Sequence, residues 1–188
     1  ILLLLLCVSN QTHKKKKTHK IFSFFFLFQV GYWDDVYGFK MTTMKSLVLP
    51  EAHVFVVKKH SVVGKRDLLH TYDIGTVKPE DLDIKESKFQ LCLSKEETTL
   101  TGLCISFDCD FKSDLLEHSV KLPTGPECTP THWKQTVLYL PEPMILDCGK
   151  EDQHVVEGKL TIARNSQNPR NLDFVLIIGE KTYKYKMG

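Results

Sequence analysis

The feature that most limits the possible folds of this chain is a long succession of short runs with strand-like character. The runs are rich in β-branched or alternating apolar residues, and Gly, Pro, Asn or Asp separate them at a spacing of about 10–15 residues. This pattern predicts an all-β sandwich or barrel. The predicted strands are 52–57, 68–74, 89–93, 103–111, 119–122, 134–140, 159–163, 172–178 and 181–185.

One of these runs has a clear alternation. Side chains point to opposite faces of a sheet in turn, so residues 103–111 predict a strand with one polar and one apolar face. The polar set is Cys104, Ser106, Asp108 and Asp110, and the apolar set is Ile105, Phe107, Cys109 and Phe111.

Residues 34–49 depart from the strand pattern and favour a helix. They place four side chains at the spacing of one helical face, and Pro50 supplies the stop. The four are Met41, Met44, Lys45 and Val48. Further along, residues 78–82 predict a turn or a one-turn helix between strands.

Length and charge exclude several classes of protein. A chain of 188 residues accommodates one sizeable domain rather than two. Five of its 25 Lys and Arg residues lie in 1–29, which holds no Asp or Glu, so residues 30–188 carry 20 basic against 23 acidic side chains. This acidic balance argues against a nucleic-acid partner and permits cationic partners. The absence of a glycine-rich nucleotide motif argues against a P-loop enzyme or a self-sufficient Rossmann enzyme.

The six cysteines are Cys7, Cys92, Cys104, Cys109, Cys128 and Cys148. They form no Cys-x-x-Cys pair and no Cys/His cluster with zinc-ligand spacing, so no metal site is predicted. Most lie in apolar runs, where a free thiol behaves as a small hydrophobic side chain. We therefore expect reduced thiols in a cytoplasmic or nuclear protein rather than disulfides.

Residues 1–29 differ from the rest of the chain. Runs of Leu, Lys and Phe follow one another without helical or strand periodicity, and the apolar blocks are too short to span a bilayer as helices. No basic region precedes the first block and no small-residue cleavage site follows it, so a secretory signal is not predicted. We interpret 1–29 as a low-complexity segment that is non-native or disordered, with a hairpin-like membrane anchor as the alternative.

The first candidate site is the segment 131–137, in which Thr131, His132 and Trp133 stand directly before a predicted strand. A strand behind a loop fixes the loop's position, so this segment is suited to present the two rings at a cleft. A neutral imidazole can orient or accept a proton when a carboxylate holds its other nitrogen, and the sequence does not show which carboxylate that is. The alternative is an ordinary surface or core histidine.

The second candidate site is the segment 31–41, which holds four aromatic residues and a Met, interrupted by two acids and two glycines. Interfaces favour Trp, Tyr, Phe and Met. The segment therefore fits an exposed arm that buries aromatic anchors against a partner. A lid packed on the chain's own barrel fits the composition equally well.

Both segments resemble signatures of the protein arginine N-methyltransferases. The matching residues are Trp33-Asp34-Asp35-Val36-Tyr37-Gly38-Phe39-Lys40-Met41 and Thr131-His132-Trp133-Lys134-Gln135-Thr136-Val137. Four further elements follow the family order: Pro50-Glu51-Ala52, Asp81-Leu82, Leu122-Pro123-Thr124-Gly125-Pro126 and Asn168-Pro169-Arg170-Asn171-Leu172. The resemblance runs from about residue 30 to the C-terminus and is strongest to the type I, asymmetric-dimethylating group. Variants within 39–41 and 50–52 point to its third numbered member.

The resemblance implies an all-β, barrel-like substrate domain at 51–188, preceded by a helical dimerisation arm at 30–50. His132 is the implied catalytic residue, which in the family pairs with an aspartate from the N-terminal half, and Thr131 and Trp133 are implied to bind the substrate arginine. The implied arm residues, which dock on the cofactor domain of a second subunit, are Trp33, Tyr37, Phe39 and Met41. The implied activity is methylation of arginine in proteins, histones included, from S-adenosylmethionine.

The family's cofactor domain, with its Gly-rich loop, acidic ribose ligand and paired glutamates, has no counterpart in this sequence. We therefore expect no cofactor and no metal to bind this chain alone, and we predict an inactive C-terminal barrel portion of a type I enzyme. The alternative is a non-catalytic module that forms a homodimer or a heterodimer with an intact methyltransferase subunit, without nucleic-acid or membrane partners. A third interpretation is a secreted β-sandwich with paired cysteines and a membrane-proximal N-terminus.

Overall fold

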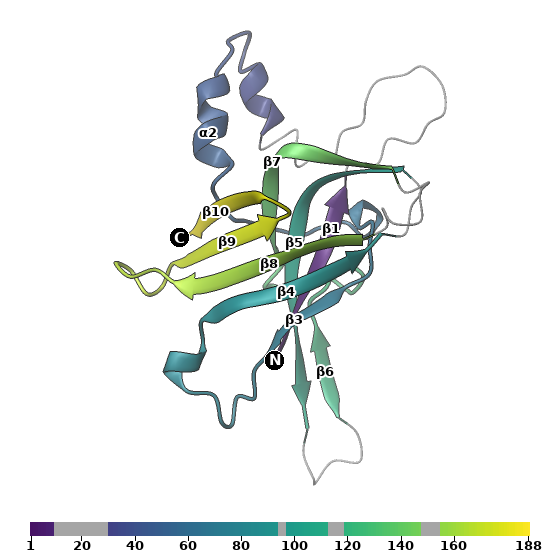
Figure 1. The fold of residues 1–188 in the computed structure, drawn as a ribbon, viewed down its shortest axis with the longest axis vertical. Helices are drawn as coiled ribbons and strands as arrows, with labels where there is room; N and C mark the ends of the chain where they lie inside the picture. The colour runs from purple at the N-terminus through teal and green to yellow at the C-terminus, as the bar shows by residue number, and fades with distance from the viewer. Residues whose placement is uncertain (10–29, 94–96, 113–118, 148–154) are drawn as a thin grey trace.

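The chain folds into two antiparallel β-sheets and a projecting helical arm (Figure 1). A computed structural model describes residues 1–9, 30–93, 97–112, 119–147 and 155–188. The first sheet has six strands in the order β2-β7-β5-β1-β3, with β6 paired to β5, and the second has the order β10-β9-β8-β4. The strands are β1 (Leu2–Ser9), β2 (His53–Phe55), β3 (Asp67–Thr71), β4 (Ile84–Cys92), β5 (Glu97–Phe111), β6 (Val120–Pro123), β7 (Gln135–Asp147), β8 (Val155–Arg164), β9 (Leu172–Ile178) and β10 (Lys181–Met187).

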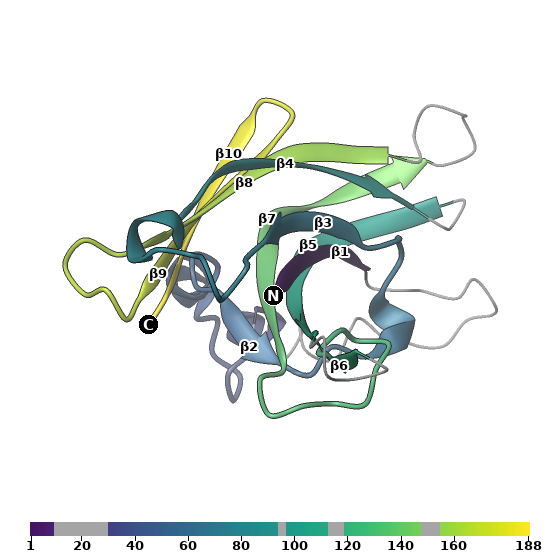
Figure 2. The same ribbon diagram turned by 90° about the horizontal axis from the view of Figure 1, so that it is seen from below.

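The two sheets curve around one hydrophobic core as a barrel-like sandwich, which is visible from below in Figure 2. On β9 the side chains of Phe174, Leu176 and Ile178 are buried, whereas the residues between them are half-buried on the outer face. This is the alternation expected of a sheet with one face against a core. The fold therefore confirms the prediction of a mostly β, barrel-like domain, and all nine predicted strands are present.

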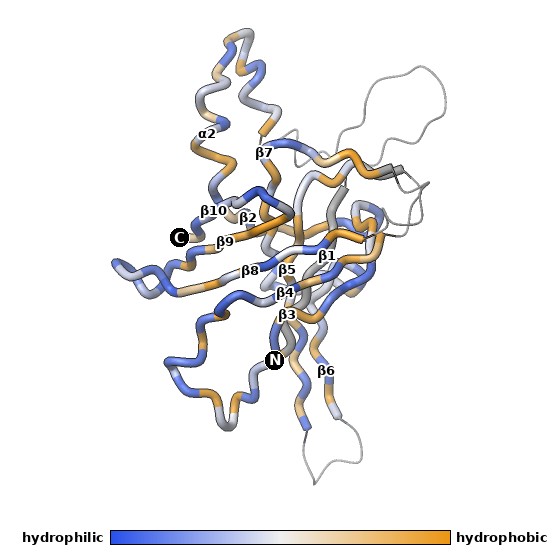
Figure 3. Tube along the Cα trace, in the orientation of Figure 1, coloured by the Kyte–Doolittle hydropathy of each residue, from blue (hydrophilic) through white to orange (hydrophobic). Residues whose placement is uncertain are grey.

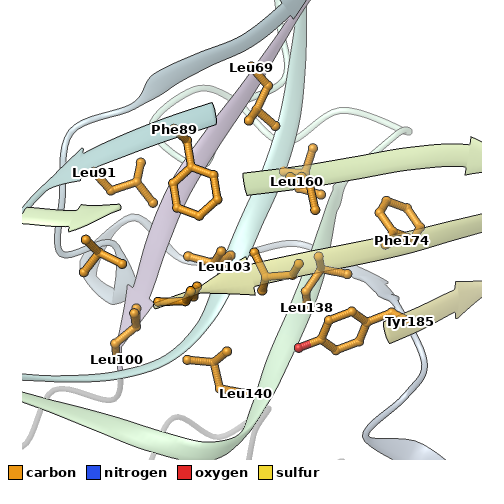
Figure 4. Packing of buried hydrophobic residues seen from close by; sticks show 14 of the residues in the cluster. Leu69, Phe89, Leu91, Leu100, Leu103, Leu138, Leu140, Leu160, Phe174 and Tyr185 are labelled. Atoms are coloured by element: carbon orange, nitrogen blue, oxygen red, sulfur yellow. The ribbon is translucent and has the colours of Figure 1, made fainter. Parts of the chain in front are cut away.

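The close-packed centre of the core comes from both sheets (Figure 4). Leu103 of β5 and Leu138 of β7 are fully buried and lie across from Leu160 of β8. At one side the hydroxyl of Tyr185 donates a hydrogen bond to the backbone oxygen of Tyr139 at 2.8 Å. This bond satisfies the polar end of a ring whose body lies in the core.

A second, smaller core covers the other face of the six-stranded sheet. Val30 and Val57 pack there against Cys104 of β5 and Val137 of β7, and all four are buried. At Cys104, the predicted polar face of 103–111 therefore lies under other residues of the chain. Ser106, on that face, is also buried, and its hydroxyl has no hydrogen-bond partner among the described residues.

The N-terminal Leu-rich run forms a strand of the six-stranded sheet, between β5 and β3. Residues Leu2–Ser9 pair with β5 along their length and with β3 through Leu2 to Leu5. The N-terminal ammonium of Ile1 donates to the carbonyl of Tyr72 at 2.8 Å. The prediction of disorder is therefore wrong for residues 2–9, because two neighbouring strands supply the pairing and register that an aperiodic Leu run does not encode by itself. Residues 10–29 lie outside the described part.

The arm rises from the sheets as two short helical segments joined by a turn (Figure 1). It consists of 3-10 helices at Gly31–Asp34 and Thr42–Met44 and the α-helix α2 (Lys45–Val48). An ion pair between Lys45 and Asp34 links its two sides, and the backbone N–H of Met41 donates to the carbonyl of Trp33 at 2.9 Å. The expected helix is therefore present but only one turn long, and Pro79–Asp81 forms the predicted one-turn helix.

Within the described residues, no helix is long and apolar enough to cross a membrane, and no three metal-ligating side chains cluster. The four cysteines whose side chains are described are free thiols, as predicted: Cys92, Cys104, Cys109 and Cys128. Burial raises the pKa of the Cys104 thiol to about 12, so this group stays protonated and unreactive.

Candidate functional site

The loop that carries His132 joins β6 to β7 and ends in a tight turn. The backbone N–H of Lys134 donates to the carbonyl of Thr131 at 3.2 Å, and Lys134 has a φ of 56°. A left-handed conformation costs a non-glycine residue of order 1–3 kcal/mol and persists only where the surrounding structure enforces it. The turn therefore fixes how His132 and Trp133 are presented.

The two rings of this loop are exposed, as expected for residues presented at a surface. The centroids of His132 and Trp133 lie 6.2 Å apart with an interplanar angle of 79°, and Trp133 is 52% exposed. Trp133 also makes an edge contact with Phe107 of β5 at 5.8 Å between centroids. Across the described residues no carboxylate pairs with His132. The ring contact that the structure gives His132 is the one with Trp133.

Thr131 differs from its two neighbours because its side-chain oxygen faces inward. Its Oγ1 is buried, and the described residues offer it no hydrogen-bond partner. Buried hydroxyls in folded proteins are nearly always hydrogen-bonded, so an orphan of this kind requires a specific explanation.

The loop is anchored by a buried amide that the sequence did not identify as important. Gln135 is 3% exposed; its Oε1 accepts from the backbone N–H of Val57 at 2.8 Å, and its Nε2 donates to the carbonyl of Thr124 at 2.7 Å. The hydroxyl of Thr124 in turn donates to the carbonyl of Phe107 at 2.6 Å and accepts from its N–H at 3.1 Å. Gln135 therefore ties both flanks of the loop to the sheet.

An ionic cluster supports the start of the same loop. Arg66 reaches Asp108 of β5 at 3.2 Å and Glu127 of the loop at 2.8 Å. A Cβ at Gly125 would lie 2.7 Å from the carboxylate oxygens of Glu127, so a larger residue there would displace the end of that side chain. These residues are 42 to 61 positions apart in the chain (Arg66 to Asp108 and to Glu127), so no local signal could have revealed the cluster.

The tip of the arm is a two-residue hairpin. Val36 and Phe39 exchange backbone hydrogen bonds of 2.9 and 3.0 Å, while Tyr37 and Gly38 have φ values of 55° and 88°. Two left-handed residues in succession are the mark of a type I′ turn. The side chain of Asp35 caps the turn by accepting from the N–H of Gly38 at 2.7 Å.

This turn places aromatic side chains in solvent. Tyr37 is 92% exposed and Phe39 is 72% exposed, whereas a lid packed on its own barrel would bury them. Met41 is also exposed, but Trp33 is half-buried and meets Tyr32 at 5.4 Å between ring centroids. The predicted arm residues are therefore together on one projecting element, at the opposite end of the view from β6 (Figure 1).

His53 is a further partnered residue that the sequence did not reveal. Its Nε2 lies 3.2 Å from the carbonyl of Val48, so it connects β2 to the end of the arm, and its ring is 5.4 Å from that of Tyr139. Burial lowers the pKa of His53, against smaller opposing effects of the Val48 carbonyl and Glu51. His53 therefore has a structural role between β2 and the arm, remote in sequence from the Thr131–Trp133 loop.

Comparison with known proteins places this arrangement in a family. Residues 18–181 match the arginine methyltransferase oligomerization subdomain. The chain is 34% identical over 158 residues to protein arginine N-methyltransferase 1 of Saccharomyces cerevisiae, which covers 84% of this chain and 42% of the yeast protein. It is also 34% identical over 167 residues to the probable protein arginine N-methyltransferase 1.2 of Arabidopsis thaliana, covering 85% and 43%. The chain belongs to the protein arginine methyltransferase family, and it spans less than half the length of these relatives.

Solved structures agree on the fold. The Trypanosoma brucei PRMT1 enzyme–prozyme heterotetrameric complex with AdoHcy has a TM-score of 0.80 and 25% identity, over all of this chain and 56% of that one. Arabidopsis thaliana protein arginine methyltransferase 10 has a TM-score of 0.70 and 17% identity, over 98% and 58%. The expected resemblance to the third numbered member of the family finds no support, because the sequence relatives carry the numbers 1, 1.2 and 8-B.

Proposed function

We propose that this chain is the substrate-side barrel of a type I protein arginine methyltransferase, whose activity is transfer of methyl groups from S-adenosylmethionine to arginine in proteins. The observation that carries the proposal is the Thr131–Trp133 loop. It presents His132 and Trp133 in solvent on a tight turn, and the buried Gln135 ties the loop to Val57 and Thr124.

The chemistry explains why such a loop is one part of a site. Methyl transfer to a guanidinium nitrogen requires the sulfonium carbon in line with the nucleophile at near-attack distance. It also requires carboxylates that hold and polarise the cationic substrate. Among the described residues, no carboxylate forms an ion pair with His132. Both requirements are met in this proposal by a cofactor-binding partner, and the chain alone is inactive.

A methyl-transfer assay tests this proposal. The isolated chain is incubated with radiolabelled S-adenosylmethionine and an arginine-rich protein, beside an intact type I enzyme as the positive control. We expect incorporation by the intact enzyme only. Incorporation by the isolated chain, lost on His132→Ala, would show that the chain carries a complete site and would contradict the proposal.

The arm supports a second function, which is association with an intact methyltransferase subunit. Its hairpin exposes Tyr37 in a left-handed conformation that is unfavourable for a tyrosine, so the ring is displayed at a cost to stability. The Trypanosoma brucei relative occurs in an enzyme–prozyme complex. A non-catalytic barrel that assembles with an active subunit is therefore the second candidate.

Tyr37→Asn separates binding from folding at this position. Asn followed by Gly is the most favourable pair for a type I′ turn, so the hairpin is retained while the aromatic ring is removed. We expect Tyr37→Asn to keep the melting temperature or raise it, and to weaken association with an intact type I enzyme at least tenfold. Equal association of Tyr37→Asn and wild type would sink the interface proposal.

A cytoplasmic or nuclear location and arginine-containing substrates, without nucleic-acid or membrane partners, complete the proposal. The acidic balance of residues 30–188 and the free thiols support it. The Phe39-Lys40-Met41 and Pro50-Glu51-Ala52 variants would place the chain nearest to the third numbered member, whereas the names of its relatives favour the first.

A further inference from the structure

A cavity of about 370 Å³ opens between the two sheets behind the candidate loop. Its wall is formed mainly by apolar side chains on the inner faces of β4, β5, β8, β9 and β10. The principal ones are Ile84, Ile105, Ile162, Leu172, Phe174 and Met187. Three of these are at most 5% exposed: Ile84, Ile105 and Phe174. Small-molecule sites are clefts of roughly 300–1,000 Å³ with predominantly apolar walls, and the mouths of β-barrels are a preferred location.

The polar groups at the mouth of the cavity already have partners. The hydroxyl of Tyr72 donates to the carbonyl of Leu82 at 2.7 Å. Asp83 and Arg164 form an ion pair at 3.2 Å, and Arg164 also donates to the carbonyl of Pro79 at 2.8 Å. Within the described lining these two are the only charged residues, and they neutralise one another. A charged ligand would find no counter-ion here and would lose its hydration.

The cavity wall is continuous with the support of Trp133. Ile105 lies opposite Thr136 in the pairing of β5 with β7, and both line the cavity. Phe107 is two residues beyond Ile105 on the same face of β5, and its ring contacts Trp133. Thr136 follows Trp133 by three residues along the chain. A molecule bound in the cavity would therefore contact β5 and β7, the two strands that hold the loop.

We propose that this cavity binds an uncharged, largely apolar small molecule and that binding changes the environment of Trp133. This ligand would occupy the space between the two sheets and not the surface of the exposed rings, so its binding is distinct from methyl transfer. Binding is favoured by removal of the apolar surfaces of the ligand and of the cavity wall from water.

The neutral dye N-phenyl-1-naphthylamine tests the proposal on the full 188-residue chain. Trp33→Phe leaves Trp133 as the only tryptophan, since the chain has two. We expect saturable enhancement of dye emission at one site per chain, accompanied by a shift of Trp133 emission at the same dye concentration. The anionic dye 1-anilinonaphthalene-8-sulfonate should bind at least tenfold more weakly. Absence of saturable binding by the neutral dye, or equal binding of the two dyes, overturns the proposal.

A filled cavity provides the second test. Leu172→Phe combined with Ile162→Phe adds volume to the wall and should weaken binding of the neutral dye at least tenfold. The matched control is Val175→Phe, on the outward face of β9, which should leave binding unchanged. Equal affinity in the filled variant and the control would place the dye elsewhere and overturn the proposal. If the filled variant does not fold, the comparison of the two dyes and the Trp133 response decide.

Discussion

The barrel buries its large apolar side chains, whereas the arm exposes them. In the barrel, Leu103, Leu138 and Leu160 are fully buried between two sheets. In the arm, Tyr37 and Phe39 stand in solvent at the tip of a hairpin (Figure 3 shows hydrophobic and hydrophilic residues interleaved there). Burying an apolar side chain stabilises the fold by about 1.5–3 kcal/mol, so exposed aromatics on a rigid turn forgo that gain. The barrel thus buries its apolar side chains for its own stability, whereas the arm leaves aromatic rings exposed, as the proposed association requires.

Removing strand β1 should have the largest effect on the stability of the barrel. Deletion of residues 1–9 leaves β3 without the strand it pairs with and uncovers an edge of β5. Unpaired edges expose backbone hydrogen-bonding groups and promote aggregation. We expect the deletion to abolish cooperative thermal unfolding in circular dichroism.

Deletion of the arm is the matched comparison. Replacing residues 32–47 by a short Gly-Ser linker should keep a cooperative transition, because Val30 and Leu49 remain to close the smaller core. The roles assigned to the two regions would be reversed if the variant without the arm lost cooperative unfolding while the variant without β1 kept it. Cooperative unfolding of both deletion variants would show that β1 is not integral to the sheet.

A single core truncation sharpens the same contrast. Leu138→Ala, at a fully buried position, should lower the free energy of unfolding by about 2–5 kcal/mol, because it removes apolar contacts and leaves a cavity. Leu47→Ala in the arm, where the side chain is 61% exposed, should change it by no more than about 0.5 kcal/mol. Urea denaturation measures both, and similar losses would mean that the arm packs on the barrel in solution.

The anchor of the Thr131–Trp133 loop should show a smaller effect. Gln135→Leu leaves the N–H of Val57 and the carbonyl of Thr124 without their buried partner, at a cost of about 1–3 kcal/mol. In the Trp33→Phe background it should also shift Trp133 emission. Glu142→Gln, which removes an exposed ion pair with Lys181, should leave both unchanged. An unaltered Trp133 spectrum in Gln135→Leu would deny the anchoring role.

Protonation of His53 should give the smallest effect. Burial lowers the pKa of this histidine, so the folded state binds its proton less readily than the unfolded chain. Its contribution to stability is therefore complete above the ordinary value of 6.5 and is lost as pH falls below it. We expect His53→Gln to flatten this part of the pH profile of unfolding free energy. A steeper profile in the variant would reverse the assigned sign.

The sequence predicted the strands well because most of them alternate or are bounded by turn residues, as in 103–111 and 172–178. It missed β1 because a run of identical Leu residues has no period, and only β3 and β5 supply its register. It placed His132 and Trp133 correctly on a loop before β7. The anchors Gln135 and Arg66 were missed because their partners are distant in the chain.

Association with an intact methyltransferase tests the division between barrel and arm most directly. Sedimentation velocity of the 21.6 kDa chain mixed with an intact type I enzyme would resolve a complex from the free species. We predict a complex with the wild-type chain and none at the same concentration with Tyr37→Asn/Phe39→Ser, although both chains unfold cooperatively. Complex formation by both chains to the same extent would contradict the account, as would the absence of a complex with either.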